Sequence, residues 1–255
     1  MITVHCGLHK TGSSAIQLAL RGIPITAGQK IVTPNPGDAS SDDGLAQRLS
    51  VLTEARDSIF SDENLLGEPY DGYQSAPERV SLLRSSLSGT RYQIVIYLRP
   101  QVDWLASVYL QGVQEGRTTD PGDFWASLAP SDFLSWSALV NLLREGSGAD
   151  RIIVRAYARS RDSVADFMGV CGFDGFSRMG RREIRENVSI SPLQAPILVA
   201  LNNEVGLTQE RSSRRRQVFQ SILINQSAAR RSPFPEAMQL DIAEHFRSDW
   251  RAVTD

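Results

Sequence analysis

The sequence predicts a single α/β domain in which helices flank a mostly parallel β-sheet, with a helical C-terminal part. Short apolar runs alternate with segments of helical spacing, which is typical of this class. The clearest run, 92–98, is nearly continuous in apolar and β-favouring residues, as expected for a parallel strand buried on both faces. With 255 residues, of which 41% are hydrophobic, the chain can bury one sizeable core.

The first part of the chain predicts a strand, a tight polar turn and a helix, which is the opening unit of many nucleotide-binding domains. The first apolar run stops at Gly7, and a turn rich in Gly, Ser and Thr follows it. In chain order we expect a strand over 2–6, a helix over 14–20, an exposed loop over 34–44, and a strand over 58–60 that ends in Ser61-Asp62-Glu63.

The rest of the chain continues the alternation. We expect strands over 92–98 and 151–157, and helices over 102–113, 133–143, 163–170 and from Pro192 onward. The prediction is one domain over 1–255, with a nucleotide-binding core over about 1–175 and a helical part over about 190–255. In such sheets ligands bind beyond the carboxyl ends of the strands, so the polar residues that follow the strands are the ones to inspect.

Composition argues against several classes of partner. The net charge of −2 gives no electrostatic reason to expect binding to nucleic acid or to a membrane surface. The first residues lack the pattern of a signal peptide, and no window approaches the roughly 18 apolar residues of a spanning helix. Cys6 and Cys171 make neither a metal spacing nor a disulfide framework, so we expect buried free thiols. These features predict a cytoplasmic protein with no transmembrane segment and no nucleic-acid partner.

Residues 7–14 have the Gly-x4-Gly spacing of a phosphate-binding loop. Glycines allow a tight bend, and the N–H groups at a helix N-terminus point at an anion. A Walker A loop has lysine directly after its second glycine, where this chain has Ser13; its lysine is Lys10, inside the loop. A Walker A enzyme also needs an acid on a neighbouring strand for Mg²⁺, whereas the strongest strand here is followed by Arg99. Transfer of a phosphoryl group from ATP needs a metal ion to help neutralise about two negative charges. A sulfuryl group carries only about one, so we expect that Lys10 and backbone N–H donors can neutralise it without a metal.

The segment from His5 to Gln17 resembles the 5′-phosphosulfate loop of sulfotransferases that use 3′-phosphoadenosine 5′-phosphosulfate (PAPS), and it is especially similar to the bacterial branch of that family. The resemblance implies that PAPS is the co-substrate and that adenosine 3′,5′-bisphosphate (PAP) is the product. It implies that Lys10 stabilises charge on the leaving phosphate. It also implies that Lys10 binds the co-substrate at the bridging oxygen. The 5′-phosphate is then held through the backbone and hydroxyl donors of Thr11, Gly12, Ser13 and Ser14.

A second motif follows the clearest predicted strand. Arg99 and Ser107 match the family's spacing of an arginine at the strand end and a serine eight positions later in the next helix. The resemblance implies that both bind the 3′-phosphate of PAPS, which suits the two parallel bonds that arginine can give a phosphate. The alternative is a surface arginine and an exposed serine. Trp104 and Leu105, between them, are expected in the core.

The general base has several candidates. Ser61-Asp62-Glu63 resembles the Ser-x-Glu segment of bacterial members, which implies Glu63 as the base that takes the acceptor proton, with Asp62 second. The alternative is a helix N-cap with a first-turn acid pair. His9, in the loop, is a further catalytic candidate or a simple hydrogen-bond donor. His5 is expected in the core and His245 at the surface.

Three weaker assignments lie further along the chain. Arg185 belongs to a segment that resembles an Arg-x-Asn-x-Ser motif near the C-terminal part of bacterial sulfotransferases, which implies a place in the phosphate site; helix capping near Pro192 is the alternative. Tyr157 is a candidate for the adenine site or for packing. The arginines over 211–216 attract an anionic acceptor or form a solvated face.

The sequence thus predicts transfer of a sulfuryl group from PAPS to a hydroxyl or amine of an acceptor by in-line displacement. The acceptor, a carbohydrate, a lipid-linked sugar or a small metabolite, is not encoded in a recognisable motif, and neither is an oligomeric state. Two alternatives belong to other classes: a phosphate-loop kinase that uses ATP, and a non-catalytic nucleotide-binding or scaffold protein.

Overall fold

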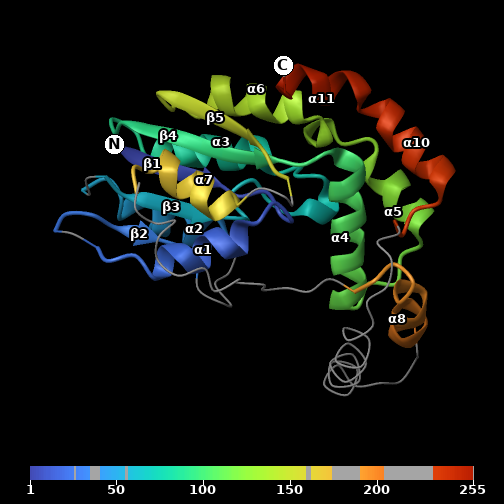
Figure 1. The fold of residues 1–255 in the computed structure, drawn as a ribbon. Helices are drawn as coiled ribbons and strands as arrows, with labels where there is room; N and C mark the ends of the chain where they lie inside the picture. Colours follow the sequence, from blue (N-terminus) through green and yellow to red (C-terminus); the bar gives the residue numbers. More distant parts are fainter. Residues whose placement is uncertain are drawn as a thin grey trace. The chain divides into compact units, whose positions relative to one another are not determined.

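The computed structural model describes residues 1–25, 27–34, 41–54, 57–158, 162–173, 190–203 and 232–254. In this part of the chain the fold is α/β, with a five-stranded sheet in which all strands pair in parallel (Figure 1). The strand order is β2-β3-β1-β4-β5. The strands are β1 (Ile2–Cys6), β2 (Ile31–Val32), β3 (Ile59–Asp62), β4 (Tyr92–Leu98) and β5 (Arg151–Ala156). The predicted fold class is confirmed.

The chain divides into two compact units. The first comprises Met1–Arg99, Ser131–Glu186 and Ser248–Asp255, and it holds the whole sheet. The second comprises Pro100–Pro130 and Asn187–Arg247. Helices α1 (Ser13–Arg21), α2 (Asp42–Ser50), α3 (Ala76–Ser86), α6 (Trp136–Gly146) and α7 (Ser163–Val170) belong to the first. Helices α4 (Gln101–Glu115), α5 (Pro121–Leu128), α8 (Ala195–Asn202) and α10 (Glu236–His245) belong to the second, and α11 (Arg247–Thr254) begins at its last residue.

Helices cover the sheet on its two faces. On one face, α1 and α7 lie over the strands (Figure 1). There Ile16, Leu20 and Phe167 pack in one core cluster with Val95 and Tyr97. On the other face, α2 packs on α3, and α3 packs on α6. All seven residues of β4 are buried, as expected for a parallel strand between two helical layers.

Within the second unit, α4 carries an aromatic cluster. The ring of Tyr109 lies 5.5 Å from that of Phe124 and 5.8 Å from that of Phe234, between ring centres. At the C-terminal end of α4, the amide nitrogen of Asn202 donates hydrogen bonds to the carbonyl oxygens of Val113 and Arg117. These contacts hold segments of the second unit that are far apart in the sequence.

Most predicted elements are present. The strands at 2–6 and 92–98 and the helix at 163–170 have the predicted bounds, and α1, α4 and β5 agree to within two residues. The expected core residues Trp104 and Leu105 are buried, as are His5 and Cys6, whereas His245 is exposed. Cys171 is a free thiol, but it is only half-buried.

Some predictions are wrong for identifiable reasons. The loop predicted over 34–44 gives way to α2 at Asp42, because Ser41 caps the helix by accepting a bond from the Gly44 N–H at 3.3 Å; residues 35–40 lie outside the described residues. The helix expected from Pro192 starts at Ala195, and that expected from 133 starts at Trp136. Strand β2 and helices α3 and α5 were not predicted; β2 has only two residues, too few for a pattern.

Candidate functional site

The polar residues that follow three strands lie at one edge of the sheet. Strand β1 is flanked by β3 and by β4, with Cys6 level with Asp62 on one side and with Ile96 on the other. The Gly7 N–H, just past β1, donates to the Asp62 carbonyl at 3.2 Å. Chain connections leave β1 and β4 in opposite directions, and in such sheets ligands bind in the crevice at this point.

The loop between β1 and α1 is closed by its own hydroxyl groups. Thr11 Oγ1 donates to the Leu8 carbonyl at 2.6 Å, and Ser13 Oγ donates to the same oxygen at 3.0 Å. Both hydroxyl protons are therefore used inside the loop. The hydroxyl of half-buried Ser14 has no partner among the described residues. The groups best placed to bind an anion are thus the N–H groups that begin α1 and the Ser14 hydroxyl, rather than the Thr11 and Ser13 hydroxyls.

Two residues of the loop have left-handed backbone. Gly12, directly before α1, has φ 86°, and Lys10 has φ 64° although it carries a side chain. A Cβ at Gly12 would lie 2.8 Å from Ser163 Oγ and 3.2 Å from a ring carbon of Tyr157. Gly12 is therefore required both by its backbone angle and by the close approach of β5 and α7. The loop places Lys10 on a strained, half-buried position beside this crowded point.

Glu63 stands beside the beginning of the loop. It directly follows β3, and its Cα lies 3.3 Å from the position that a Cβ on Gly7 would take. Glu63 is half-buried. The loop lysine and this carboxylate therefore belong to neighbouring segments at the same edge of the sheet. No helix begins at Asp62 or Glu63, so the alternative of a helix N-cap is wrong.

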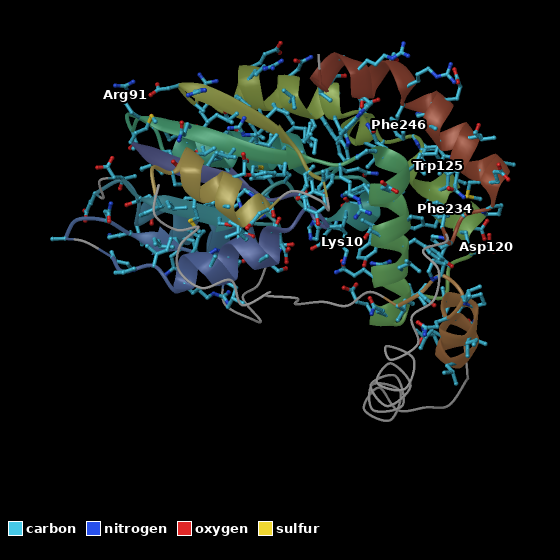
Figure 2. All side chains as sticks on the ribbon, in the orientation of Figure 1. Lys10, Arg91, Asp120, Trp125, Phe234 and Phe246 are labelled. Atoms are coloured by element: carbon cyan, nitrogen blue, oxygen red, sulfur yellow. The ribbon has the colours of Figure 1, made fainter. Side chains whose placement is uncertain are left out.

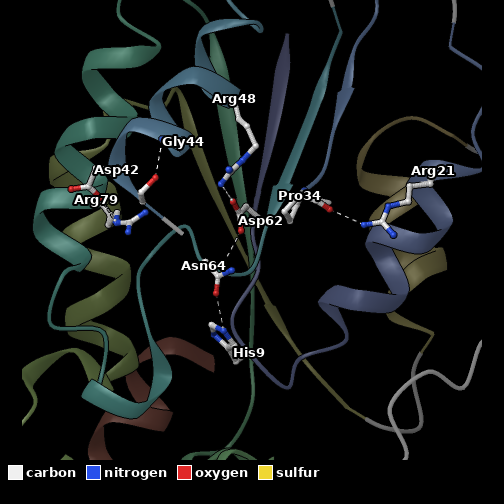
Figure 3. A network of polar contacts seen from close by, with 10 residues as sticks. His9, Arg21, Pro34, Asp42, Gly44, Arg48, Asp62, Asn64 and Arg79 are labelled. Atoms are coloured by element: carbon white, nitrogen blue, oxygen red, sulfur yellow. Dashed lines mark hydrogen bonds and ion pairs between the residues drawn. The ribbon is translucent and has the colours of Figure 1, made fainter. Parts of the chain in front are cut away.

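Asp62 is part of a buried ion pair. Its carboxylate lies 2.7 Å from Nη2 of Arg48, on α2, and it also accepts a hydrogen bond from the Asn64 N–H at 2.9 Å (Figure 3). Only 1% of the Asp62 side chain is exposed. A carboxylate that is buried and bonded in this way anchors the end of β3, and it is poorly placed to take a proton from an acceptor.

His9 is enclosed by two residues that follow β3. Its Nε2 lies 3.2 Å from Oδ1 of Asn64 (Figure 3). Its Nδ1 and its backbone nitrogen each lie 3.3 Å from the hydroxyl of Tyr73. Burial lowers the pKa of His9 to about 4; the bond to Asn64 raises the pKa, and the charge of Lys10 lowers it further. His9 is therefore uncharged at neutral pH.

His5 is a core histidine of β1, as predicted. Its Nδ1 lies 2.8 Å from Ser61 Oγ on β3, and burial lowers its pKa to about 3. Its ring packs against those of Tyr97 and Phe167. Its Nε2 has no hydrogen-bond partner among the described residues, so it is less well satisfied than expected.

Arg99 reaches the loop from the end of β4. Its Nη1 donates to the Lys10 carbonyl at 3.4 Å, and its guanidinium carbon lies 6.0 Å from the ring centre of Tyr157. The carbonyl of Arg99 accepts a hydrogen bond from the Trp136 indole at 2.8 Å. Only 6% of Arg99 is exposed. The structure thus brings Arg99, Lys10 and Tyr157 together, which a surface arginine would not do.

For the remaining predicted residues, the structure describes no position relative to the loop. Ser107 lies on α4, in the second unit, so its pairing with Arg99 stays a prediction. Arg185 and the arginines over 211–216 lie outside the described residues. The sequence did not point to Asn64, Tyr73, Arg48 or Ser163, because each reaches the loop region only through tertiary contacts and belongs to no motif.

The described residues contain no group of three or more His, Cys, Asp or Glu side chains placed to hold a metal ion. In the same part of the chain, no helix has the length and apolar character needed to cross a membrane. Compared with protein-family models, with curated proteins and with solved structures, the chain matches none. The fold and the loop therefore define an α/β protein with a phosphate-loop-like strand–loop–helix unit.

Proposed function

We propose that the protein is a sulfotransferase that moves a sulfuryl group from PAPS to a hydroxyl or amine of an acceptor. The observation that carries the proposal is the arrangement around one loop: Lys10 lies within it, Arg99 reaches it from β4, and Glu63 flanks its beginning after β3. Two cationic residues and an acidic residue thus belong to segments around the loop that leads into α1, and this suits an anionic donor and a protic acceptor.

Each residue then has a role in an in-line displacement. The acceptor oxygen or nitrogen attacks sulfur, the bond between sulfur and the bridging oxygen of the 5′-phosphate breaks, and PAP leaves. Glu63 takes the acceptor proton, while Lys10 stabilises the negative charge that develops on the bridging oxygen. The N–H groups at the start of α1 stabilise the sulfuryl and 5′-phosphate oxygens. Arg99 binds the 3′-phosphate, with Ser107 and Arg185 as further donors.

A kinase that uses ATP is less well supported. Such an enzyme needs an acid on a neighbouring strand to help hold Mg²⁺. The acid at the end of β3 is Asp62, which is already paired with Arg48 at 2.7 Å. Holding Mg²⁺ through Asp62 would require this buried pair to break, which is costly.

Calorimetric titration of the metal-free protein with PAP, AMP and ATP tests the proposal. We expect PAP to bind, and Arg99→Ala to weaken its binding about 100-fold, because a charged, bidentate contact to the 3′-phosphate is lost. Arg91→Ala is the matched control: Arg91 precedes β4 at the opposite end of the sheet from Lys10 and pairs with Asp150 (Figure 2). It should bind PAP as the parent does. Preference for ATP with Mg²⁺ would support the kinase, and PAP binding without turnover on any acceptor would support the non-catalytic protein.

A further inference from the structure

We infer that uncharged His9 is a structural link: its hydrogen bonds connect the loop over residues 7–14 to the end of β3. Asn64 and Tyr73 are then positioning residues that hold the His9 side chain in place. The inference deepens the proposed function and rests on it for the roles of Lys10 and Glu63. It assigns the proton transfer to Glu63 and gives His9 a structural task in the same site.

The contacts of the imidazole determine which nitrogen carries the proton. Nε2 faces the amide oxygen of Asn64 at 3.2 Å, and an amide oxygen can only accept, so Nε2 carries the hydrogen. Nδ1 then has a lone pair, which faces the Tyr73 hydroxyl at 3.3 Å. The same hydroxyl oxygen accepts from the His9 N–H. Because both ring nitrogens face a partner, a base role for His9 would require these contacts to break first.

Burial and the local backbone conformation hold Tyr73 in place. It is fully buried, and its φ of 62° is unusual for a residue with a side chain. Its neighbour Gly72 is also left-handed, and the Gly72 carbonyl accepts a hydrogen bond from Ser131 Oγ at 2.6 Å. A backbone held in this conformation directs the tyrosine hydroxyl at the loop, and such strain persists only when the surroundings over-determine it.

This structural link affects the positions of both Lys10 and Glu63, which the proposed reaction uses. Lys10 directly follows His9, and Glu63 lies between two anchored residues. On one side of Glu63, the Asp62 carboxylate is bonded to Arg48 and its carbonyl accepts the Gly7 N–H. On the other side, the Asn64 side chain is bonded to His9 and its N–H donates to Asp62 (Figure 3). The His9–Asn64 bond therefore helps set the separation between Glu63 and Lys10.

The protonation state can be measured directly, because the chain has only three histidines. Long-range ¹H–¹⁵N spectra of the imidazoles, assigned with His9→Gln and His245→Gln, should show His9 as the Nε2–H tautomer, uncharged down to about pH 5.5. In Asn64→Ala the ring should lose this single tautomer. A His9 imidazole that takes up a proton between about pH 6 and 8, or one that carries its hydrogen on Nδ1, would overturn the inference.

Kinetics then separate positioning from acid–base catalysis. Asn64→Ala and Tyr73→Phe should each lower kcat about 10-fold while the PAPS KM stays within about twofold, because misplacement acts on the transition state. His9→Gln, whose amide can still donate to Asn64, should retain at least about 10 times the turnover of His9→Ala. Equal losses in the two His9 variants would mean that the bond to Asn64 does not contribute to turnover, which would overturn the inference.

The outcomes distinguish this inference from the proposed function. If PAP does not bind, the sulfotransferase proposal fails. The spectra of the parent and of Asn64→Ala still decide whether the structural link through His9 exists. If PAP binds and PAPS turns over, but Asn64→Ala leaves both the His9 spectrum and kcat unchanged, the proposed function stands and the inference that His9 is a structural link is wrong. His245→Gln, at an exposed histidine of the second unit, serves as the kinetic control and should behave as the parent does.

Discussion

The loop over residues 7–14 is held in different ways on its two sides. Toward β3, the loop bonds to groups that have partners of their own: His9 is bonded to Asn64 at 3.2 Å, and the Gly7 N–H donates to the carbonyl of Asp62, whose carboxylate pairs with Arg48 at 2.7 Å. Toward β4, the guanidinium of Arg99 donates to the Lys10 carbonyl at 3.4 Å and lies 6.0 Å from the centre of the Tyr157 ring. The β3 side therefore resembles a fixed frame, whereas the contacts of Arg99 are of a kind that a phosphate can readily replace. We expect damage to the β3 side to appear in stability, and damage to the other side to appear in donor binding.

The largest expected effect is on the β3 side. Arg48→Met removes the partner of a carboxylate that is only 1% exposed, so the free energy of unfolding should fall by about 3 kcal/mol or more, as for other uncompensated buried charges. Urea denaturation at neutral pH measures the change. The control is Arg91→Ala, which breaks an exposed pair with Asp150 and should cost less than about 1 kcal/mol. Similar losses in the two variants would remove the contrast between the two sides.

Acid should also weaken the β3 side. The pKa values of His5 and His9 are lowered by burial from 6.5 to about 3 and about 4, so the unfolded chain binds protons that the folded chain does not. Their stabilisation is fully present above about pH 6.5, and it is lost as the pH falls through the folded pKa values. At pH 5 each histidine should cost about 2 kcal/mol relative to pH 8.

Urea denaturation at pH 8 and pH 5 measures this loss. His5→Asn should reduce the difference between the two pH values, because its amide can keep the contact to Ser61 and does not titrate. A His5→Asn protein with the same pH dependence as the parent would mean that other groups are responsible.

Gly12→Ala tests the crowded side of the loop. The methyl group would meet Ser163 Oγ at 2.8 Å, at a residue whose φ of 86° already costs an alanine about 1 kcal/mol. We expect PAP binding, measured by calorimetry, to weaken more than about 10-fold because the loop must shift. Gly28→Ala is the matched control, since Gly28 has the same φ of 86° with nothing within 4 Å. It should lose about the same backbone stability and bind PAP normally.

The smallest expected effect concerns the ring beneath Arg99. Tyr157→Leu removes the cation–π contact and should weaken PAP binding about 2- to 5-fold, whereas Tyr157→Phe keeps the ring and should bind as the parent does. Equal losses in both variants would point to the hydroxyl. A loss far above 10-fold in Tyr157→Leu would mean that the ring contacts the nucleotide itself.

The sequence predicted four of the five described strands because they contain apolar runs, as at Tyr92–Leu98, whereas β2 has only two residues. It also placed Lys10, Glu63 and Arg99 near one another, since the carboxyl ends of parallel strands share an edge. It gave no indication of the contact of His9 with Tyr73, because the two residues are 64 positions apart and nothing local marks Tyr73. Nor did it indicate that the Thr11 and Ser13 hydroxyls donate to the Leu8 carbonyl, because these bonds depend on the backbone conformation of the loop.

The position of β1 has a consequence for how the protein is made. β1 lies in the middle of the sheet, yet its two neighbours come much later in the chain: Thr3 pairs with Ile59, and Ile2 pairs with Tyr92. During translation, β1 and the loop are made before either neighbour, and pairing between such distant segments is slow. A nascent chain that stops before Leu98 would contain every residue of the loop but would lack Arg99, which the proposed 3′-phosphate site requires.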